Sequence, residues 1–248
     1  MFNENMLTWK QYENIRDKYS HIASFAYWPK WHKGNKAEPL IVRSEDEFNE
    51  RLLNKIHCNA VIVGFNYGIN DDIEKIIDDN SLNGEQQVTE LKKSMYFSNQ
   101  YGGSYGKKAL NEAFKGTFVE GAYMTDLFKF KLSEKNWEGT GMPTAKGSEF
   151  KKRLKEKPEK IEFNIKGLRY ELYNVAEIKQ DPIFIFLGEG LFDDEIMSLI
   201  NVSFPKYFPN SKIYIFSHYQ RRGYKKEDFI FEAENLLKRI KSDYGDSF

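Results

Sequence analysis

Residues 60–68 read AVIVGFNYG, four consecutive apolar residues that run into a polar turn bounded by glycines. Three further short runs share this apolar character, at residues 122–124 (AYM), 183–187 (IFIFL) and 213–216 (IYIF). A continuous rather than alternating apolar run is typical of a strand buried on both faces, as in a parallel sheet covered by helices. The four runs therefore predict a central four-stranded parallel sheet.

Segments with helical character separate or flank these runs. Apolar side chains recur at helical spacing in residues 46–56, 193–202 and 226–240, and residues 149–157 form a charged helix candidate. Strands that alternate with helices imply right-handed crossover connections, with helices on the faces of the sheet. We therefore expect an α/β fold of three layers, α/β/α.

The chain has 248 residues, a length that one α/β domain can fill, and it shows no repeat or clear domain boundary. We expect a single domain over 1–248. Residues 1–50 are rich in aromatic side chains and are predicted to pack as an extension on that domain. Residues 78–117 hold Asn-Gly, Gly-Gly and many polar residues, which predicts a loop-rich insertion between the first two strands.

Charge and cysteine content exclude some functional classes. The 37 basic and 37 acidic residues balance, so no global signal for bulk phosphate binding exists, although a local basic patch can serve a nucleic-acid enzyme. Cys58 is the one cysteine, so no internal disulfide forms and a reducing compartment is the simplest interpretation. No signal peptide is visible and no apolar run approaches the roughly 18 residues that span a membrane, so we expect a cytoplasmic protein.

The sequence gives no indication of a metal or a cofactor. The four histidines lack the spacing of metal ligands, and the chain has no phosphate-binding loop or dinucleotide fingerprint. We expect neither a metal nor a cofactor, and we expect a monomer.

Ligands of open parallel α/β sheets bind beyond the carboxyl ends of the strands. Polar residues follow three of the predicted strands. Asn66 lies in the first turn, where a simple turn role is an equal interpretation, and Asp126 follows the second strand, where it can also act as a helix N-cap. The fourth strand leads into His218, Arg221 and Arg222, groups that suit charge stabilisation and phosphate contact.

Together these strand ends resemble the uracil-DNA glycosylase superfamily, over about residues 58–240. The family's first motif, Gly-x-(Asp/Asn/Glu)-Pro-(Gly/Tyr), is matched by GFNYG at residues 64–68. Its second strand ends in Thr-Asn, two apolar residues and Lys, matched by TDLFK at 125–129. Its third strand leads into Leu-Gly, as at 187–188, and its last motif begins with a histidine, matched by SHYQRR at 217–222.

The resemblance implies a DNA glycosylase, a hydrolase of DNA repair that flips a base from the helix and cleaves its glycosidic bond. Asn66 would position the attacking water and His218 would stabilise negative charge on the departing base. Arg221 and Arg222 would contact the DNA. Phe97 would stack on the base and Asp126 would read its edge. The other implied substrate contacts are Gly64, Phe65, Tyr67 and Gly68.

Three departures from the family pattern affect the expected specificity. Tyr67 replaces the usual proline. Asp126 replaces the amide that reads uracil, and an ionised carboxylate only accepts hydrogen bonds, which favours an amino-bearing base. Gly68 stands where strict uracil enzymes have a bulky tyrosine, which leaves room for a 5-substituent. Ordinary uracil is therefore not the expected preferred substrate.

Two other functions fit the same residues. A non-catalytic module that binds nucleic acid or nucleotide is favoured by Asn66, which cannot take a proton from water as a carboxylate does. A hydrolase or transferase of a small nucleotide or sugar could use the same sheet. Basic runs at 107–108, 151–153 and 221–222 could contact a DNA backbone, although a solvated helix face is the simpler interpretation of 151–153.

Overall fold

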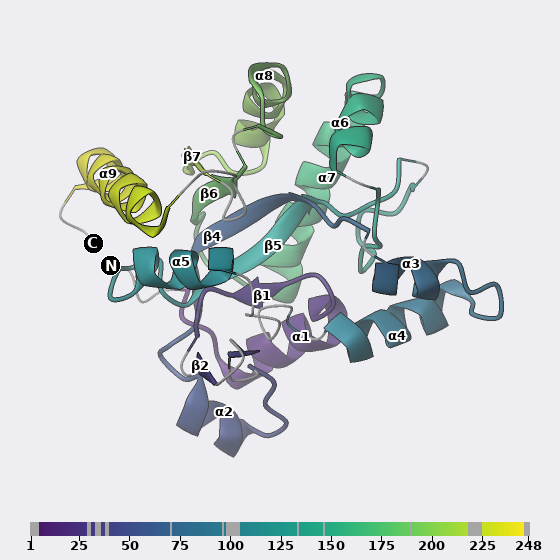
Figure 1. The fold of residues 1–248 in the computed structure, drawn as a ribbon, viewed down its shortest axis with the longest axis horizontal. Helices are drawn as coiled ribbons and strands as arrows, with labels where there is room; N and C mark the ends of the chain where they lie inside the picture. Colours follow the sequence, from purple (N-terminus) through teal and green to yellow (C-terminus); the bar gives the residue numbers. More distant parts are fainter. Residues whose placement is uncertain are drawn as a thin grey trace.

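The computed structural model describes residues 5–28, 31–32, 36–37, 40–69, 71–95, 97, 105–132, 134–145, 147–188, 190–217 and 225–245. A five-stranded sheet forms the centre of the molecule (Figure 1). Its strands are β1 (Ser24–Phe25), β4 (His57–Asn66), β5 (Ala122–Phe128), β6 (Ile183–Leu187) and β7 (Ile213–Phe216). A separate two-stranded sheet pairs β2 (Trp31–His32) with β3 (Lys36–Ala37).

The central sheet has the strand order β1-β5-β4-β6-β7 and is mixed. Strands β5, β4, β6 and β7 are parallel to one another. Strand β1 runs antiparallel to β5 through the pairs Ser24–Met124 and Phe25–Tyr123. The α/β class is thus confirmed, and a purely parallel sheet of four strands is wrong. A two-residue edge strand is too short to show a periodic pattern in sequence.

Helices surround the sheet (Figure 1). They are α1 (Trp9–Tyr19), α2 (Glu45–Arg51), α3 (Asp71–Ile77), α4 (Gly84–Met95), α5 (Tyr105–Phe114), α6 (Gly147–Lys155), α7 (Glu159–Tyr170), α8 (Asp194–Ser203) and α9 (Lys226–Tyr244). A π-helical turn, Glu171–Val175, extends α7, and a 3₁₀ turn, Phe204–Lys206, follows α8.

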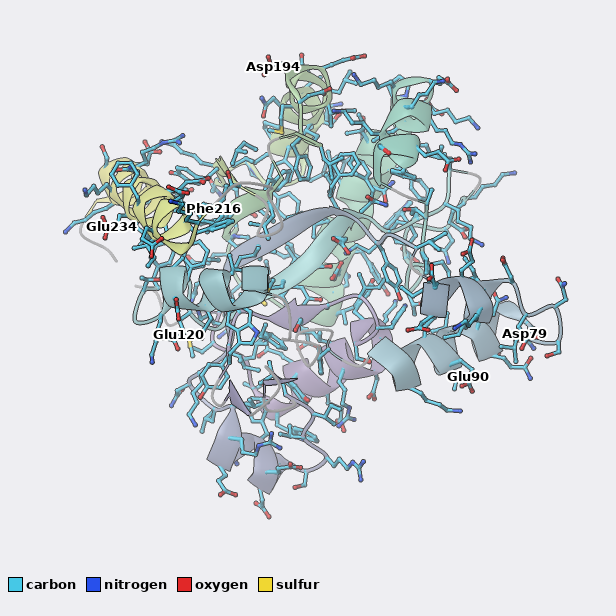
Figure 2. All side chains as sticks on the ribbon, viewed as in Figure 1. Asp79, Glu90, Glu120, Asp194, Phe216 and Glu234 are labelled. Atoms are coloured by element: carbon cyan, nitrogen blue, oxygen red, sulfur yellow. The ribbon has the colours of Figure 1, made fainter. Side chains whose placement is uncertain are left out.

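Two apolar clusters lie on opposite faces of the sheet. On one face, α5 and α9 pack together. The ring of Phe216 of β7 lies 5.2 Å from that of Phe114 of α5 and 6.3 Å from that of Phe229 of α9, between centroids. Figure 2 labels Phe216 near α9. On the other face, side chains of α1, α7 and α8 share one cluster with the sheet. Tyr12 of α1 and Phe25 of β1 belong to this cluster, so the aromatic N-terminal segment contributes to the main core.

The segment at 78–117, predicted as a loop-rich insertion, is helical in much of its described part. Helices α4 and α5 lie within it. Leu91 of α4 and Leu110 of α5 are fully buried, and their burial stabilises helices whose polar composition had indicated loops. Helices α3 and α4 form a pair that extends from the body of the molecule (Figure 1).

Candidate functional site

The ends of β4 and β5 bring the first two sequence motifs together. The two strands are parallel, and their register pairs Gly64 with Asp126 and Asn66 with Phe128. Gly64, Asn66 and Asp126 are each half-buried, whereas the alternating residues Phe65 and Leu127 are buried. Because alternate residues of a strand face the same side, Asn66 and Asp126 lie on the same face of adjacent strands, two positions apart in register, at the carboxyl edge of the sheet.

Gly64 provides the space that the Asp126 side chain occupies. A Cβ atom at position 64 would lie 2.1 Å from Oδ1 of Asp126 and 3.3 Å from its Cγ. No real side chain tolerates a contact of 2.1 Å, so the carboxyl group and any residue larger than glycine exclude each other. The glycine of the first motif therefore determines where the acid of the second motif lies.

The surroundings of Asp126 favour its neutral form. Burial raises the pKa of this carboxyl group from 3.8 to about 6, with the charge of Glu171 acting in the same direction and that of Lys129 opposing it. Near neutral pH the group is mostly ionised and only accepts hydrogen bonds, and at mildly acidic pH it also donates one. Asp126 thus changes its hydrogen-bonding character in the physiological range.

Asn66 holds a loop across the strand ends. Its Nδ2 donates to Oγ1 of Thr144 and to the carbonyl oxygen of Ala145, both at 2.9 Å. Since the carbonyl of Ala145 can only accept, the orientation of the amide is fixed. Within the described part of the chain, no residue donates to Oδ1 of Asn66, so this oxygen is the group that can serve a ligand.

Residues 141–145, the 141–145 loop, are joined to both strands by backbone hydrogen bonds. Met142 N donates to Lys129 O at 2.8 Å, and Thr144 N donates to Tyr67 O at 2.9 Å. Gly141 has a φ of +79°, and a Cβ there would lie 2.8 Å from Ile22 and 3.0 Å from Lys129. Glycine is therefore required for this close approach, which fixes the loop beside Asn66.

Tyr67 and His21 place two unsatisfied polar atoms beside this site. Their ring centroids are 6.0 Å apart, and neither Tyr67 OH nor His21 Nδ1 has a hydrogen-bond partner among the described residues, although both are buried. Nε2 of His21 lies 3.2 Å from Gly141 O and donates to it, so Nδ1 is the acceptor. Burial lowers the pKa of His21 to about 4, and burial and the charge of Asp126 raise the pKa of Tyr67. A hydrogen-bond donor and an acceptor thus lie unpaired, and the sequence singled out only the tyrosine.

A buried ion pair lies beside β5 and is hydrogen-bonded to two of its side chains. Lys129 and Glu171 are both 0% exposed and pair directly, and Lys129 Nζ also donates to Thr125 Oγ1 at 2.7 Å. Glu171 Oε1 accepts from Tyr123 OH at 2.6 Å and from Thr125 Oγ1 at 2.8 Å. Glu171 belongs to the π-helical turn, a rare element that occurs often at functional sites. The acid was missed in the sequence because it lies 42 residues from its partner.

Two of the predicted substrate contacts are corrected by the structure. Phe97 is fully buried, with Tyr12 and Phe25 at centroid distances of 5.5 and 5.6 Å, so its ring belongs to the core and offers no face to a base. Phe65 is 3% exposed and packs edge-on against the ring of Phe128 at 4.9 Å. Both rings serve packing, because the strand and core positions that they occupy face inward.

Gly68 is half-buried, and a Cβ there would meet only ordinary contacts, the nearest being Ala145 O at 3.8 Å. His218, Arg221 and Arg222 lie outside the described residues, and their predicted roles stay predictions. The structure therefore brings together Gly64, Asn66 and Asp126 of the predicted site and adds His21 to them.

Clusters of three or more metal-ligating side chains are not found in the part of the chain that the structure describes. In the same residues, no helix is both long and apolar enough to cross a membrane. Comparison of the chain with protein-family models, with curated proteins and with solved structures found no match of significance in any of the three searches.

Proposed function

We propose that the protein is a DNA glycosylase-like hydrolase, which receives a flipped base at the β4–β5 edge and cleaves its N-glycosidic bond. The observation that carries this proposal is the pairing of Gly64 with Asp126 beside Asn66. An oriented amide and a carboxyl group with an altered pKa lie on neighbouring strands at the edge where open parallel sheets bind ligands. The parallel order β5-β4-β6-β7 supports the proposal because it directs all four motif-bearing strand ends to one edge.

Asn66 has the role of positioning water. Its two amide hydrogens are held by the 141–145 loop, so Oδ1 is left to accept a hydrogen bond from a water molecule. That water adds to C1′ of the sugar while the bond from C1′ to the base breaks, and the base leaves with the electron pair. The proton released by the water passes to solvent or to the base. Because the amide cannot take this proton, the reaction depends on stabilising the departing base, the role that the resemblance gives to His218.

Asp126 has the role of reading the base edge. In its ionised form it accepts a hydrogen bond from an exocyclic amino group, so an amino-bearing or modified base is the favoured substrate. The unpaired hydroxyl of Tyr67 supplies a hydrogen-bond donor near the same carboxyl group. Gly68 leaves space near the 141–145 loop, which agrees with a base that carries a substituent.

A non-catalytic module that binds nucleic acid is the second candidate. The observation that favours it is the engagement of both Asn66 amide hydrogens with Thr144 and Ala145, since a residue that holds a loop need not act on water. In this case Asp126 and Tyr67 would still recognise a base, and the glycosidic bond would stay intact.

The test is an excision assay with labelled single-stranded and duplex oligonucleotides that carry uracil, hypoxanthine, 5-substituted cytosines or normal bases. Alkali reveals abasic sites. We expect excision at one amino-bearing or modified base, reduced at least about 100-fold in Asn66→Ala and His218→Ala, the size of effect that water-positioning and charge-stabilising groups produce.

Thr144→Val is the matched control for Asn66→Ala. It removes the two hydrogen bonds of the Thr144 hydroxyl, one accepted from Asn66 Nδ2 and one donated to Tyr67 O. The amide oxygen of Asn66 stays in place, so most of the activity should survive. Efficient excision of ordinary uracil would contradict the proposed base preference. Binding without excision would favour the non-catalytic module.

A further inference from the structure

A cationic groove begins beside Asn66 and runs along α6. Its volume is about 480 Å³, and its polar walls include Lys131, Arg153, Lys157 and Glu156. Thr144 and Ala145 line the groove as well, and these are the two residues that accept hydrogen bonds from Asn66. This α6 groove therefore adjoins the proposed active site through the two residues that hold Asn66.

The lining of the groove carries more positive than negative charge, and nearby carboxylates balance only part of it. Three cationic side chains face one carboxylate, that of Glu156. Arg153 pairs with Glu149 at 2.5 Å, and both side chains are more than half exposed, so this pair is weak and open to exchange. No ion pair engages Lys131 or Lys157 within the described residues, and both side chains are exposed.

Two of the other three cations of α6, Lys151 and Lys155, are already engaged by protein carboxylates. Lys151 lies 2.8 Å from Asp193, and Lys155 pairs with Asp193 and Glu195 of the first turn of α8 and its N-cap. The basic run at 151–153 is thus divided, because Lys151 fastens α6 to α8 while Arg153 faces the groove. Arg153 is exposed and also lines a concave site that it shares with Lys131 and Lys157.

Two other grooves lined by described residues have less suitable charge. The groove along α9 has two carboxylates, Asp228 and Glu232, and one cation, Arg239, so its lining has a net negative charge that repels phosphate. The groove near the start of β4 presents Lys55 against Glu120, which leaves no excess. Of the three, only the α6 groove combines a cationic lining with contact to the residues around Asn66.

We propose that the α6 groove binds the sugar–phosphate backbone of the DNA strand whose base enters the site. This inference rests on the proposed function and gives the strand its path: the base lies over Asn66 and Asp126, and the phosphates follow along Lys131, Arg153 and Lys157. Cations that replace the counterions of several phosphates give affinity that falls as salt rises. Lysine and arginine on two walls of one groove suit a chain of phosphates better than a single phosphate group.

The test compares wild type with the triple variant Lys131→Gln, Arg153→Gln, Lys157→Gln. The matched control, Lys75→Gln, Lys93→Gln, Lys238→Gln, removes three exposed cations of α3, α4 and α9. The probe is a fluorescein-labelled single-stranded 16-mer without a target base, and anisotropy is recorded from 50 to 200 mM KCl. We expect the groove variant to lose at least tenfold in affinity and its log–log salt slope to fall by roughly 2, at about 0.7 for each lost contact, with the control within about twofold of wild type.

The outcomes separate this inference from the proposed function when excision is measured on the same three proteins. If the groove variant keeps the wild-type affinity and slope, the groove assignment is wrong even where excision is found. If wild type binds with the expected salt dependence and the groove variant does not, the assignment stands even where no base is excised. Absence of oligonucleotide binding by wild type overturns the groove assignment, and displacement of the 16-mer by an equal concentration of nucleoside monophosphate overturns it in favour of a single-phosphate site.

Discussion

Oδ1 of Asp126 lies where a side chain of Gly64 would have to begin, 2.1 Å from the position of a Cβ atom. The two residues face each other across the β4–β5 ladder, so a change at either position moves the other. This relationship joins two motifs that lie 62 positions apart in the sequence (126 − 64). It makes the position of the acid, and with it the proposed base recognition, depend on a residue without a side chain.

Gly64→Ala should displace the Asp126 carboxyl group. We expect a loss of about 1–3 kcal/mol in the free energy of unfolding, as overpacked positions show, and at least about tenfold weaker binding of the preferred oligonucleotide. Urea denaturation and anisotropy titration measure the two effects. Gly84→Ala is the control, because no atom lies within 4 Å of a Cβ there.

The shorter side chain of Asp126→Ser should relieve the clash. The double variant Gly64→Ala, Asp126→Ser is therefore expected to lose less free energy of unfolding than the two single variants lose together. The difference, the coupling energy, should be about 1 kcal/mol or more. Strict additivity would show that the two side chains do not compete for one space.

Base preference should depend on pH through Asp126. With a pKa raised to about 6, the carboxyl group donates and accepts at pH 5 and mostly accepts at pH 7.5. We expect the preference for a cytosine-type over a uracil-type oligonucleotide to rise about tenfold over this range, since a hydrogen bond to a charged group contributes roughly 1.5 kcal/mol or more. Competition binding at both pH values measures the ratio. In Asp126→Asn, whose amide does not titrate, the ratio should stay constant.

The same group affects stability in the opposite sense to most carboxylates. Its pKa is higher in the folded state than the ordinary value of 3.8, so the folded state binds more protons between pH 4 and 6. The free energy of unfolding therefore falls as pH rises through this range, by at most about 3 kcal/mol. Asp126→Asn should lack this fall in urea titrations at pH 4.5, 5.5 and 7. An identical pH profile in both proteins would contradict the burial of the charge.

Two histidines should destabilise the fold in acid. Burial lowers the pKa values of His21 and His57 from 6.5 to about 4 in each case. The unfolded chain binds protons that the folded state excludes, so stability is complete above about pH 6.5 and is lost as pH falls toward 4, by at most about 3 kcal/mol for each residue. The double variant His21→Gln, His57→Gln should show a shallower acid limb in urea titrations. To isolate the effect, the comparison is made in the Asp126→Asn background, where the opposing carboxyl group is absent.

Glu171→Gln should be far more harmful than its conservative chemistry indicates. The amide can still accept from Tyr123 and Thr125, but Lys129 is left as an unpaired charge with no exposed surface. We expect a loss of about 3–5 kcal/mol in the free energy of unfolding. Glu195→Gln removes one of the two carboxylate partners of Lys155, at a site where the side chains of Lys155 and Glu195 are 29% and 60% exposed, and it should cost less than about 1 kcal/mol.

The second change Lys129→Met tests the cause of that loss. With Glu171→Gln it leaves no buried charge, and most of the lost stability should return. Equal losses in the single and double variants would locate the effect in packing rather than in charge.

The strands were predictable to the extent that their residues are apolar. The runs at 183–187 and 213–216 coincide with β6 and β7, whereas β4 and β5 extend beyond the predicted 60–63 and 122–124. The extensions contain polar residues that partners satisfy. Asn59 accepts a hydrogen bond from the backbone of Asn5, and Thr125 donates to Glu171. Sequence patterns cannot show partners so distant in the chain.

Helix limits depended on backbone conformations that composition does not reveal. The helix expected over 46–56 is α2, which ends at Arg51, and Asn54 follows with a φ of +60°. A left-handed residue ends helical hydrogen bonding, and asparagine tolerates that conformation better than most residues. The glycine-bounded turn after β4 and the acid after β5 were found in the sequence because strand ends mark them. The contribution of His21 could not be found in the sequence, because His21 lies in a segment outside every motif.

The edge strand β1 protects the central sheet against self-association with other copies of the chain. β5 and β7 are the two outer parallel strands, and β1 covers part of the free edge of β5 through Ser24 and Phe25. An uncovered edge presents backbone groups that template pairing with another chain, which leads to aggregation. A chain that began after residue 28 would lose this cover together with the buried rings of Tyr12, Tyr19 and Phe25. The N-terminal segment therefore protects the edge of β5, the strand that bears Asp126, from pairing with another chain. We expect a protein that lacks this segment to self-associate through β5 and to lose its function.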